Sequence, residues 1–287
     1  MQITDHSSSG ATAKSIQLAN LAFNFHHPDS PSFSYNKTQA LSPQQYRISI
    51  NPENYPSHTT PDCLLQRNGY SIHLVNSLKQ RIKATTLIKR MYASRGYNTD
   101  SASVFSHKPN ELTFLVLIQE VAAGTVTLRS DSRQGLLADR LYRDKINEFR
   151  QKGRKVCELS RFAIDPQYSS KEMTASLFQI AYTCARNEYE ATDFFCEVNP
   201  RHAAPQKRMF GFQQIGEERT CPRVNAPAVL LHLELEFVKQ QINTLAGSGS
   251  QNTNRSLYPH CLPFRNISTN RYHYKMHNNQ VTLGQVL

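Results

Sequence analysis

With 287 residues and a hydrophobic share of 39%, the chain holds enough apolar material for the core of one or two domains. Its longest apolar run, "LTFLVLI", is far shorter than the roughly 20 residues that cross a bilayer. The first residues lack the basic and apolar parts of a secretory signal, so we expect a cytoplasmic protein. The net charge of +11 indicates an acidic partner, but no run of five Lys or Arg occurs, and we expect no nucleic-acid partner.

Both ends of the chain are rich in Ser, Asn, Gln, Pro and Thr and show no sustained hydrophobic period. Such segments bury too little apolar area to offset chain entropy, so we expect flexible tails at residues 1–65 and 240–287. Residues 66–239 are predicted to form one domain. Residues 61–239 carry 26 Lys and Arg against 19 Asp and Glu, so most of the positive charge lies on this domain.

The cysteines show no Cys-x-x-Cys spacing, and three of them sit in apolar segments. They are Cys63, Cys157, Cys184, Cys196, Cys221 and Cys261. This pattern indicates free thiols that pack like small apolar side chains rather than a disulfide framework or a zinc site. The sequence therefore predicts no metal site.

Hydrophobic periodicity predicts the elements of the domain in chain order. Residues 70–76 alternate as a strand, and residues 78–97 have the period of a helix with basic residues opposite its apolar side. That apolar side is predicted to carry Leu78, Ile82, Leu87, Ile88, Met91 and Tyr92. A hairpin follows, with strands at residues 111–119 and 121–129 and a tight turn near Glu120.

The middle of the domain alternates between helices and strands. A helix over residues 135–153 ends in glycine, and the apolar strand of residues 155–164 follows it. In the next helix, apolar side chains recur at i, i+4, i+7, i+8 and i+11, and Ser169 with Glu172 is predicted to form its capping box. The apolar positions are Met173, Leu177, Ile180, Ala181 and Cys184.

The last predicted elements are a strand at residues 193–199, a helix at 202–210 and two strands at 211–218 and 227–237. Strands and helices thus alternate along most of the domain. This order predicts an α/β fold with a mixed central β-sheet flanked by helices.

The strand of residues 155–164 carries Glu158 and Arg161, three positions apart in an apolar setting where a charge is costly unless it is paired or used. In a regular strand the two side chains point to opposite faces, because the side-chain period is two. A bulge that adds one residue would bring them into one site. With a bulge they would form an active-site pair, and in a regular strand they would be unrelated solvent or interface contacts. The structural alternative to a catalytic role is a buried ion pair that holds the sheet.

The order of elements and the segment "VNPRHAAPQKRMFGFQQIG" resemble the GNAT acyltransferase fold. The stretches "LIKRMYASRGY", "GTVTLRSDSRQGLLADRLY", "VCELSRFAID" and "VNPRH" resemble the long-chain N-acyl amino acid synthase family, which is related to the homoserine-lactone autoinducer synthases. The resemblance covers about residues 70–238. It implies transfer of an acyl group from acyl carrier protein to the amine of an amino acid acceptor. An acyl-phosphopantetheine thioester would be the donor substrate, with no tightly bound cofactor, and a lipid product leaves room for peripheral contact with a membrane.

Two departures from the wider GNAT pattern bear on the donor. Relatives that use CoA have Gln/Arg-x-x-Gly-x-Gly/Ala before the long helix, whereas this chain has the glycine-free "DPQYSSKEM". This disfavours the alternative of a CoA-dependent N-acetyltransferase of a small amine and suits phosphopantetheine, whose single phosphate could meet the helix start. Many relatives also have a Tyr that protonates the leaving thiolate, where this chain has Gln206 and Lys207. A non-catalytic module that binds an acidic partner is the other alternative.

The resemblance implies roles for several side chains. Glu158 would act as general base for the acceptor ammonium, and Arg161 would hold Glu158 or bind the acceptor carboxylate. Substrate contacts are expected from Tyr92 toward the acyl chain, from Arg129 and Asp131 toward the acceptor, and from His202. The simpler alternatives are, in the same order, a core aromatic, a solvent contact, a turn cap and a structural histidine. Docking of the acidic carrier protein is expected at Lys171, Arg201, Lys207 and Arg208, which could equally be solvated surface charges.

Overall fold

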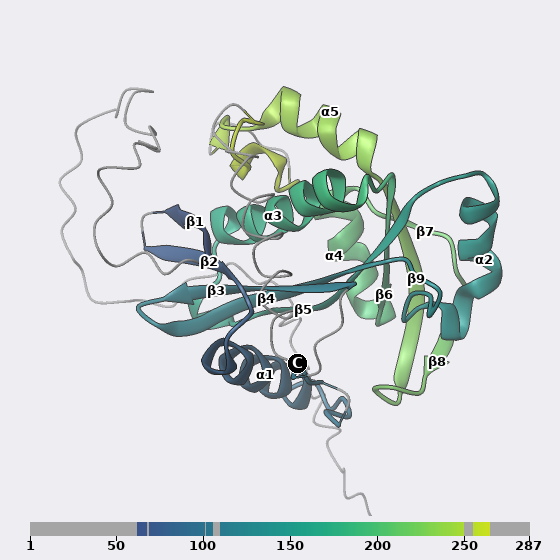
Figure 1. Cartoon of the computed structure of the whole chain (residues 1–287), viewed down its shortest axis with the longest axis horizontal. Helices are drawn as coiled ribbons and strands as arrows, with labels where there is room; N and C mark the ends of the chain where they lie inside the picture. Colours follow the sequence, from purple (N-terminus) through teal and green to yellow (C-terminus); the bar gives the residue numbers. More distant parts are fainter. Residues whose placement is uncertain (1–61, 68, 101, 106–109, 250–254, 265–287) are drawn as a thin grey trace, which may run out of the picture.

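The computed structural model describes residues 62–67, 69–100, 102–105, 110–249 and 255–264 (Figure 1). Of the expected tails, residues 1–61, 250–254 and 265–287 lie outside the described residues.

The described strands form one mixed sheet in the order β1-β2-β3-β4-β5-β6-β9-β7, with β8 paired to β9. Their bounds are β1 Cys63–Arg67, β2 Tyr70–Leu74, β3 Glu111–Ile118, β4 Val121–Ser130, β5 Val156–Ile164, β6 Asp193–Val198, β7 Gln213–Gln214, β8 Arg219–Cys221 and β9 Ala226–Glu234. Only β5 and β6 pair in parallel among these strands, and the other neighbours are antiparallel. The expected α/β architecture with a mixed central sheet is confirmed.

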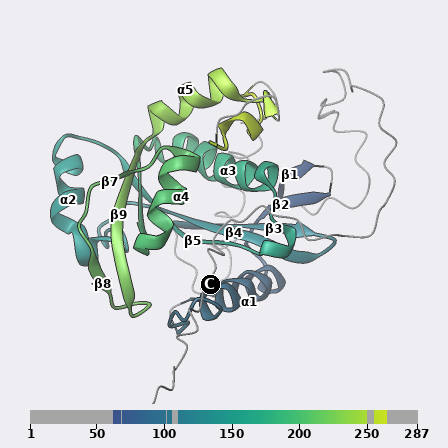
Figure 2. The ribbon, with the colours of Figure 1, turned by 180° about the vertical axis from the view of Figure 1, so that it is seen from behind.

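Helices cover both faces of the sheet (Figures 1 and 2). Their bounds are α1 Leu78–Ala93, α2 Asp139–Gln151, α3 Lys171–Tyr189, α4 Pro200–Phe210 and α5 Leu235–Leu245, with short 3-10 turns η2 Pro166–Tyr168 and η4 Tyr258–His260. Helix α1 lies against one face of the sheet, whereas α3 and α5 lie on the opposite side. A parallel β5–β6 pair requires such a crossover, which α3 provides.

The buried stripe of α1 differs from the predicted one in its first turns. Ala84, Leu87, Ile88 and Met91 are buried, at the i, i+3, i+4 and i+7 spacing of a single helix face. Leu78 and Ile82 are 66% and 49% exposed, respectively. Ile82 precedes Ala84 by two positions and therefore points to nearly the opposite side of the helix. The helix begins at a capping box that Ser77 and Gln80 form.

The cap of α3 lies one residue later than predicted. The Ser170 hydroxyl, not that of Ser169, accepts a hydrogen bond from the Met173 amide at 3.1 Å. Ser169 instead ends the η2 turn, in which the Asp165 side chain accepts from the Gln167 amide. The predicted capping box of Ser169 and Glu172 is therefore wrong, because the 3-10 turn shifts the start of the helix.

Helix α3 is buried on all sides along most of its length. Every residue from Met173 to Ala185 is buried, although the sequence predicted only one apolar face. The sheet covers one side, and the carboxy-terminal segment, residues 255–264, covers the other. Within that segment Leu257 and Tyr258 are each 2% exposed. A helix with no exposed face lies inside a core rather than on its surface.

The folded unit therefore extends past both expected boundaries. Strand β1 begins at Cys63, before residue 66, and α5 continues past residue 239 to Leu245. Ile242 of α5 is part of the same apolar core as the carboxy-terminal segment. The expected tail of residues 240–287 thus contains packed residues. The polar composition around them hid five side chains that tertiary contacts bury in the core, Ile242, Leu257, Tyr258, Cys261 and Leu262.

We predict that the hydrogen bonds between Gln179 and Leu262 stabilise the whole domain. The Gln179 side chain donates to the Leu262 carbonyl at 2.6 Å and accepts from its amide at 2.8 Å, and both are buried. Gln179→Met keeps the length of the side chain but leaves two backbone groups unsatisfied. We expect the free energy of unfolding to fall by about 2–4 kcal/mol, measured by urea denaturation.

The matched control is Thr183→Val on the same helix. The Thr183 hydroxyl is buried and has no hydrogen-bond partner, so its removal should leave the free energy of unfolding unchanged or slightly higher. An equal loss in both variants would mean that polarity in α3, and not its bond to the carboxy-terminal segment, determines stability.

Candidate active site

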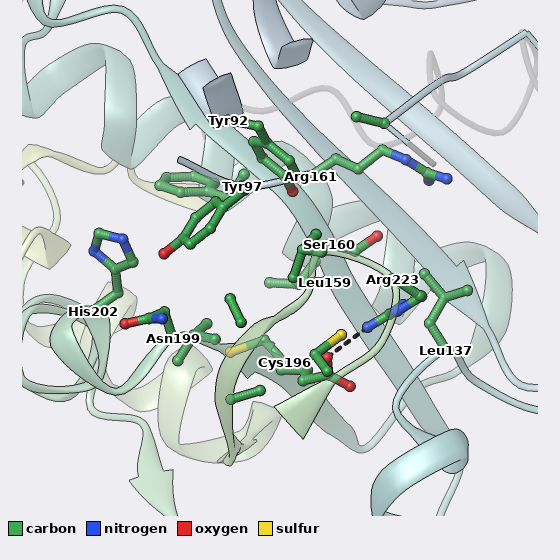
Figure 3. Close-up of a pocket in the computed structure, with 18 of the residues that line it drawn as sticks. Tyr92, Tyr97, Leu137, Leu159, Ser160, Arg161, Cys196, Asn199, His202 and Arg223 are labelled. Atoms are coloured by element: carbon green, nitrogen blue, oxygen red, sulfur yellow. Dashed lines mark hydrogen bonds and ion pairs between the residues drawn. The ribbon is translucent and has the colours of Figure 1, made fainter. Parts of the chain in front are cut away.

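A cavity of about 430 Å³ opens where β5 and β6 separate (Figure 3). The parallel ladder joins Val156–Glu158 to Asp193–Phe195, and the pairing of the two strands ends there. The later halves of both strands line the cavity together with α4, the segment after α1 and the turn between β8 and β9. This separation of β5 and β6, called the splay below, lets residues of two central strands line the cavity.

A bulge in β5 lies beside this cavity. Thr125 and Thr127 of β4 pair with Ala163 and Ser160 of β5, so two steps on one strand oppose three on the other. The bulge consists of Arg161 and Phe162, the two residues between Ser160 and Ala163. Arg161 has a φ of 49°, in the left-handed region. The Thr125 hydroxyl donates to the Arg161 carbonyl at 2.9 Å and holds the bulge. As a result Glu158 and Arg161 both line the cavity, which a regular strand would not allow.

Glu158 is a buried carboxylate whose hydrogen bonds come from backbone amides. Its side chain accepts from the Leu137 and Ala138 amides at the start of α2, the latter at 3.4 Å. Burial raises the pKa of Glu158 to about 7, against the lowering effects of Arg223 and of the Leu137 amide. A carboxylate with this pKa is divided between its two protonation states near neutral pH. It can therefore take up and release a proton there.

Arg161 pairs with Glu111 and not with Glu158. Its Nη1 atom lies 3.6 Å from Glu111 Oε2 and is buried without a hydrogen-bond partner. Tyr92 lies next to Arg161 at the cavity (Figure 3). Burial raises the pKa of the Tyr92 phenol, so this group stays protonated. A buried guanidinium nitrogen with spare donor capacity suits a carboxylate ligand.

Four charged residues that line the cavity were missed by sequence reasoning, namely Arg95, Asp100, Glu197 and Arg223. Arg223, in the turn between β8 and β9, donates from Nη2 to Glu197 Oε1 at 2.8 Å, and both line the cavity. Glu197 Oε2 is buried without a hydrogen-bond partner. Glu197 gave the same signal as Glu158, a carboxylate in an apolar strand. Arg223 stands in an unremarkable turn, "CPRVN", and only the fold brings it here.

His202 and the segment after α1 form another side of the cavity (Figure 3). Burial, with Arg95 and Arg201 nearby, lowers the pKa of His202 to about 4, so its imidazole is neutral at pH 7. Tyr97, which the sequence analysis did not single out, lies under the Arg201 guanidinium at 5.1 Å from the ring centre. Its hydroxyl accepts from Arg201 Nε at 3.3 Å. Aromatic and basic groups therefore border this side.

The structure does not bring Arg129 or Asp131 to the cavity wall. Arg129 is 3% exposed and forms an ion pair with Glu111. Asp131 accepts two hydrogen bonds from Arg150, at 2.7 and 2.9 Å. Both side chains are already occupied by opposite charges within the protein. Neither Arg129 nor Asp131 lines the cavity, so this geometry does not support the expected substrate contacts.

The side chains expected to dock a carrier protein are all exposed. Arg201, Lys207 and Arg208 belong to α4, and Lys171 is the first residue of α3. Lys207 donates to Gln214 at 3.3 Å. Helix α4 also supplies His202 and Gln206 to the cavity wall, so one face of this helix meets the cavity and another carries basic groups.

One end of the cavity is apolar. Its wall there consists of Phe162 and Ile164 of β5, Phe178 of α3, Phe210 of α4 and Phe212. The Phe178 and Phe210 rings are stacked, with centres 4.3 Å apart. The cavity thus joins a charged part around Glu158 and Arg223 to an aromatic part that suits an alkyl chain.

All six cysteines are free and buried. In the part of the chain that the structure describes, no three His, Cys, Asp or Glu side chains are grouped as ligands for a metal ion. None of the helices within the described ranges is long and apolar enough to cross a bilayer.

Comparisons with known proteins agree with this arrangement. The family model of the N-acyl amino acid synthase FeeM matches residues 83–234. The structure of FeeM, an N-acyl amino acid synthase from uncultured soil microbes, is similar with a TM-score of 0.53 and 29% identity, over 58% of this chain and 90% of that one. No curated protein sequence matches significantly.

Two further structures share less with this chain. An acyl-CoA N-acyltransferase from Pseudomonas aeruginosa has a TM-score of 0.40 and 11% identity, over 57% of this chain and 97% of that one. The AHL synthase LasI has a TM-score of 0.38 and 12% identity, over 58% and 89%. With the FeeM match and the strand order, the expected GNAT-like acyltransferase fold is confirmed.

We predict that Glu158 makes the protein less stable as the pH rises. Its pKa is 4.5 ordinarily and about 7 in the fold, so between these values the unfolded chain releases a proton that the native protein keeps. The contribution of Glu158 to the free energy of unfolding is fully present below pH 4.5 and is lost as the pH rises through about 7. Glu158→Gln removes this loss. Between pH 5 and 8, the free energy of unfolding of the variant minus that of the wild type should therefore increase by on the order of 3 kcal/mol, measured by urea denaturation.

A constant difference between the two proteins across this range would contradict a raised pKa. Glu172→Gln serves as the control, because it removes a carboxylate whose side chain is 50% exposed.

Proposed function

Because the chain belongs to the FeeM family of N-acyl amino acid synthases, which are acyltransferases, we propose that it moves a long-chain fatty acyl group from acyl carrier protein to the amino group of an amino acid. The observation that carries the proposal is Glu158, a buried carboxylate with a pKa of about 7 at the mouth of the β5–β6 splay. An amine can attack a thioester only after it loses a proton, and a group with this pKa can accept it near neutral pH.

In this mechanism Glu158 takes a proton from the acceptor ammonium, directly or through water. The neutral amine attacks the thioester carbonyl, and the tetrahedral intermediate collapses with loss of the sulfur. An amide bond forms, a carbon–sulfur bond breaks, and the second amine proton is released. Tyr92 lines the same cavity and keeps its phenolic proton, so it is placed to protonate the leaving thiolate. This would fill the role that Gln206 and Lys207 leave open.

The charged and apolar parts of the cavity suit the two substrates. Arg161 Nη1, buried without a hydrogen-bond partner, would bind the acceptor carboxylate, with Glu111 on its other side. His202, neutral at pH 7, would contact the acceptor or the thioester without adding charge. The aromatic end around Phe178 and Phe210 would hold the acyl chain.

Two features support a carrier protein over CoA as the donor. The connection between β5 and α3 is a 3-10 turn without glycine, and the Ser170 hydroxyl already takes one of the amides at the helix start. Little bare backbone is left there for a pyrophosphate. The exposed basic residues of α4, with Lys171, supply attraction for an acidic protein. CoA-dependent acetyl transfer to a small amine remains the second candidate, favoured by the fold alone.

Mass spectrometry of lipid extracts tests the proposal as a whole. Cells that produce the protein should contain N-acyl amino acids that are absent from cells producing Glu158→Gln. Acetylated amines without long-chain products would support the second candidate instead.

We predict that Glu158→Gln lowers kcat by roughly 10²–10⁴-fold, because the amide cannot accept the proton. In the wild type, kcat/KM should rise with pH up to about 7, as Glu158 ionises, and this limb should vanish in the variant. The measurement is steady-state acyl transfer from purified acyl carrier protein. Glu172→Gln controls for the loss of a carboxylate, and near wild-type turnover by Glu158→Gln would refute the assignment.

We also predict that a double reversal, Lys207→Glu with Arg208→Glu, slows transfer from the carrier protein much more than from acyl-CoA. Exposed charges mainly speed association, and salt screens them, so the difference should shrink as salt increases. Arg143→Glu in α2 with Lys152→Glu at its C-cap makes the same change of charge at exposed positions and should have little effect. Equal losses with both donors would show that Lys207 and Arg208 serve the fold or the cavity.

A further inference from the structure

We infer that Tyr258, in the carboxy-terminal segment, supports the aromatic end of the cavity and thereby limits the length of the acyl chain that the protein accepts. The inference rests on the proposed acyl transfer, since it assigns the apolar end to the acyl chain. The segment, residues 255–264, lies beyond residues 83–234, which match the family. The length of the acyl chain that the protein accepts would then depend on residues outside that match.

Tyr258 stands directly behind two residues of the cavity wall. Phe178 and Phe210 line the cavity, whereas Tyr258 does not. The Tyr258 ring meets Phe178 edge to face, with centres 6.3 Å apart, and its hydroxyl donates to the Phe210 carbonyl at 2.6 Å. At 2% exposure it has no room to withdraw toward solvent. The stacked Phe178 and Phe210 therefore pack against a buried side chain on the side away from the cavity.

The segment that carries Tyr258 is itself tied to three helices. The Leu257 amide donates to the Met209 carbonyl at 2.9 Å, at the end of α4. Gln179 of α3 holds Leu262 through two hydrogen bonds. On the α5 side, Phe237 packs edge to face against Tyr258, with centres 6.2 Å apart. In Figures 1 and 2 the segment lies over α3, beside α5.

A rigid wall at this place has a direct effect on selectivity. Each methylene that enters an apolar site favours binding by about fourfold, and the gain stops where the wall no longer yields. Closely packed interiors accept extra carbon atoms only by forcing side chains out of their rotamers. If Tyr258 is replaced by a smaller side chain, the Phe178 ring gains space behind it, and the cavity can lengthen.

Free fatty acids allow a test that does not depend on catalysis. Lauric, myristic and palmitic acids would be titrated against the full-length protein by displacement of a fluorescent fatty acid. In Tyr258→Leu and Tyr258→Ala, affinity for palmitic relative to lauric acid should rise by at least about fourfold. Tyr258→Leu is included because it keeps more of the core filled than alanine does. Thermal melting would establish that each variant is folded.

Two control variants change the same segment without removing the ring. Tyr258→Phe loses the hydrogen bond to the Phe210 carbonyl, and His260→Ala loses the 3.0 Å contact between its Nδ1 atom and Glu172 Oε1. Both should keep the wild-type ratio of affinities. A folded Tyr258→Leu protein with that same ratio would overturn the inference, as would the absence of saturable fatty-acid binding by the wild type. Fatty-acid binding and the shift without any acyl transfer would refute the proposed function alone.

Discussion

The bulge at Arg161 is the constraint on which the site depends. A non-glycine residue in the left-handed region costs about 1–3 kcal/mol, which the surrounding structure has to offset. The Thr125 hydroxyl supplies one contact, and the antiparallel β4–β5 ladder on either side supplies the rest. The result is that Glu158 and Arg161 line one cavity. The pairing of β5 with β6 ends after Glu158, and the cavity lies where the two strands separate.

The charged groups around the cavity differ in whether they have a partner of opposite charge. Arg129 has Glu111, and Arg223 has Glu197, each within a direct ion pair. Glu158 has hydrogen bonds from neutral amides and only the more distant fields of Arg223 and Arg129, without a direct ion pair. Its ionised form is therefore the least compensated of the buried carboxylates named here, and its pKa lies near neutrality for that reason. A regular Glu158–Arg161 ion pair would have lowered this pKa and made a poorer base.

Sequence reasoning reached those parts of the molecule that local patterns encode. The strands, the long helices and the importance of Glu158 follow from periodicity and from a charge in an apolar strand. Whether Arg161 joined Glu158 could not be predicted, because the bulge depends on Thr125 of a neighbouring strand. Arg223 was missed for a similar reason, since a turn residue shows no period. Asp131 and Arg129 were expected at the substrate, but each meets an opposite charge that no sequence spacing reveals.

Helix α3 did carry a signal for the part of the fold that was missed. Thirteen consecutive residues, from Met173 to Ala185, contain no charge, which a helix with one face toward water would not tolerate. Such a helix requires a cover on its outer side, and the carboxy-terminal segment with α5 supplies it. Because Phe178 of this helix also lines the cavity, the cover and the site share a wall. The shape of the site is therefore a property of the whole packed chain rather than of the region that matches the family alone.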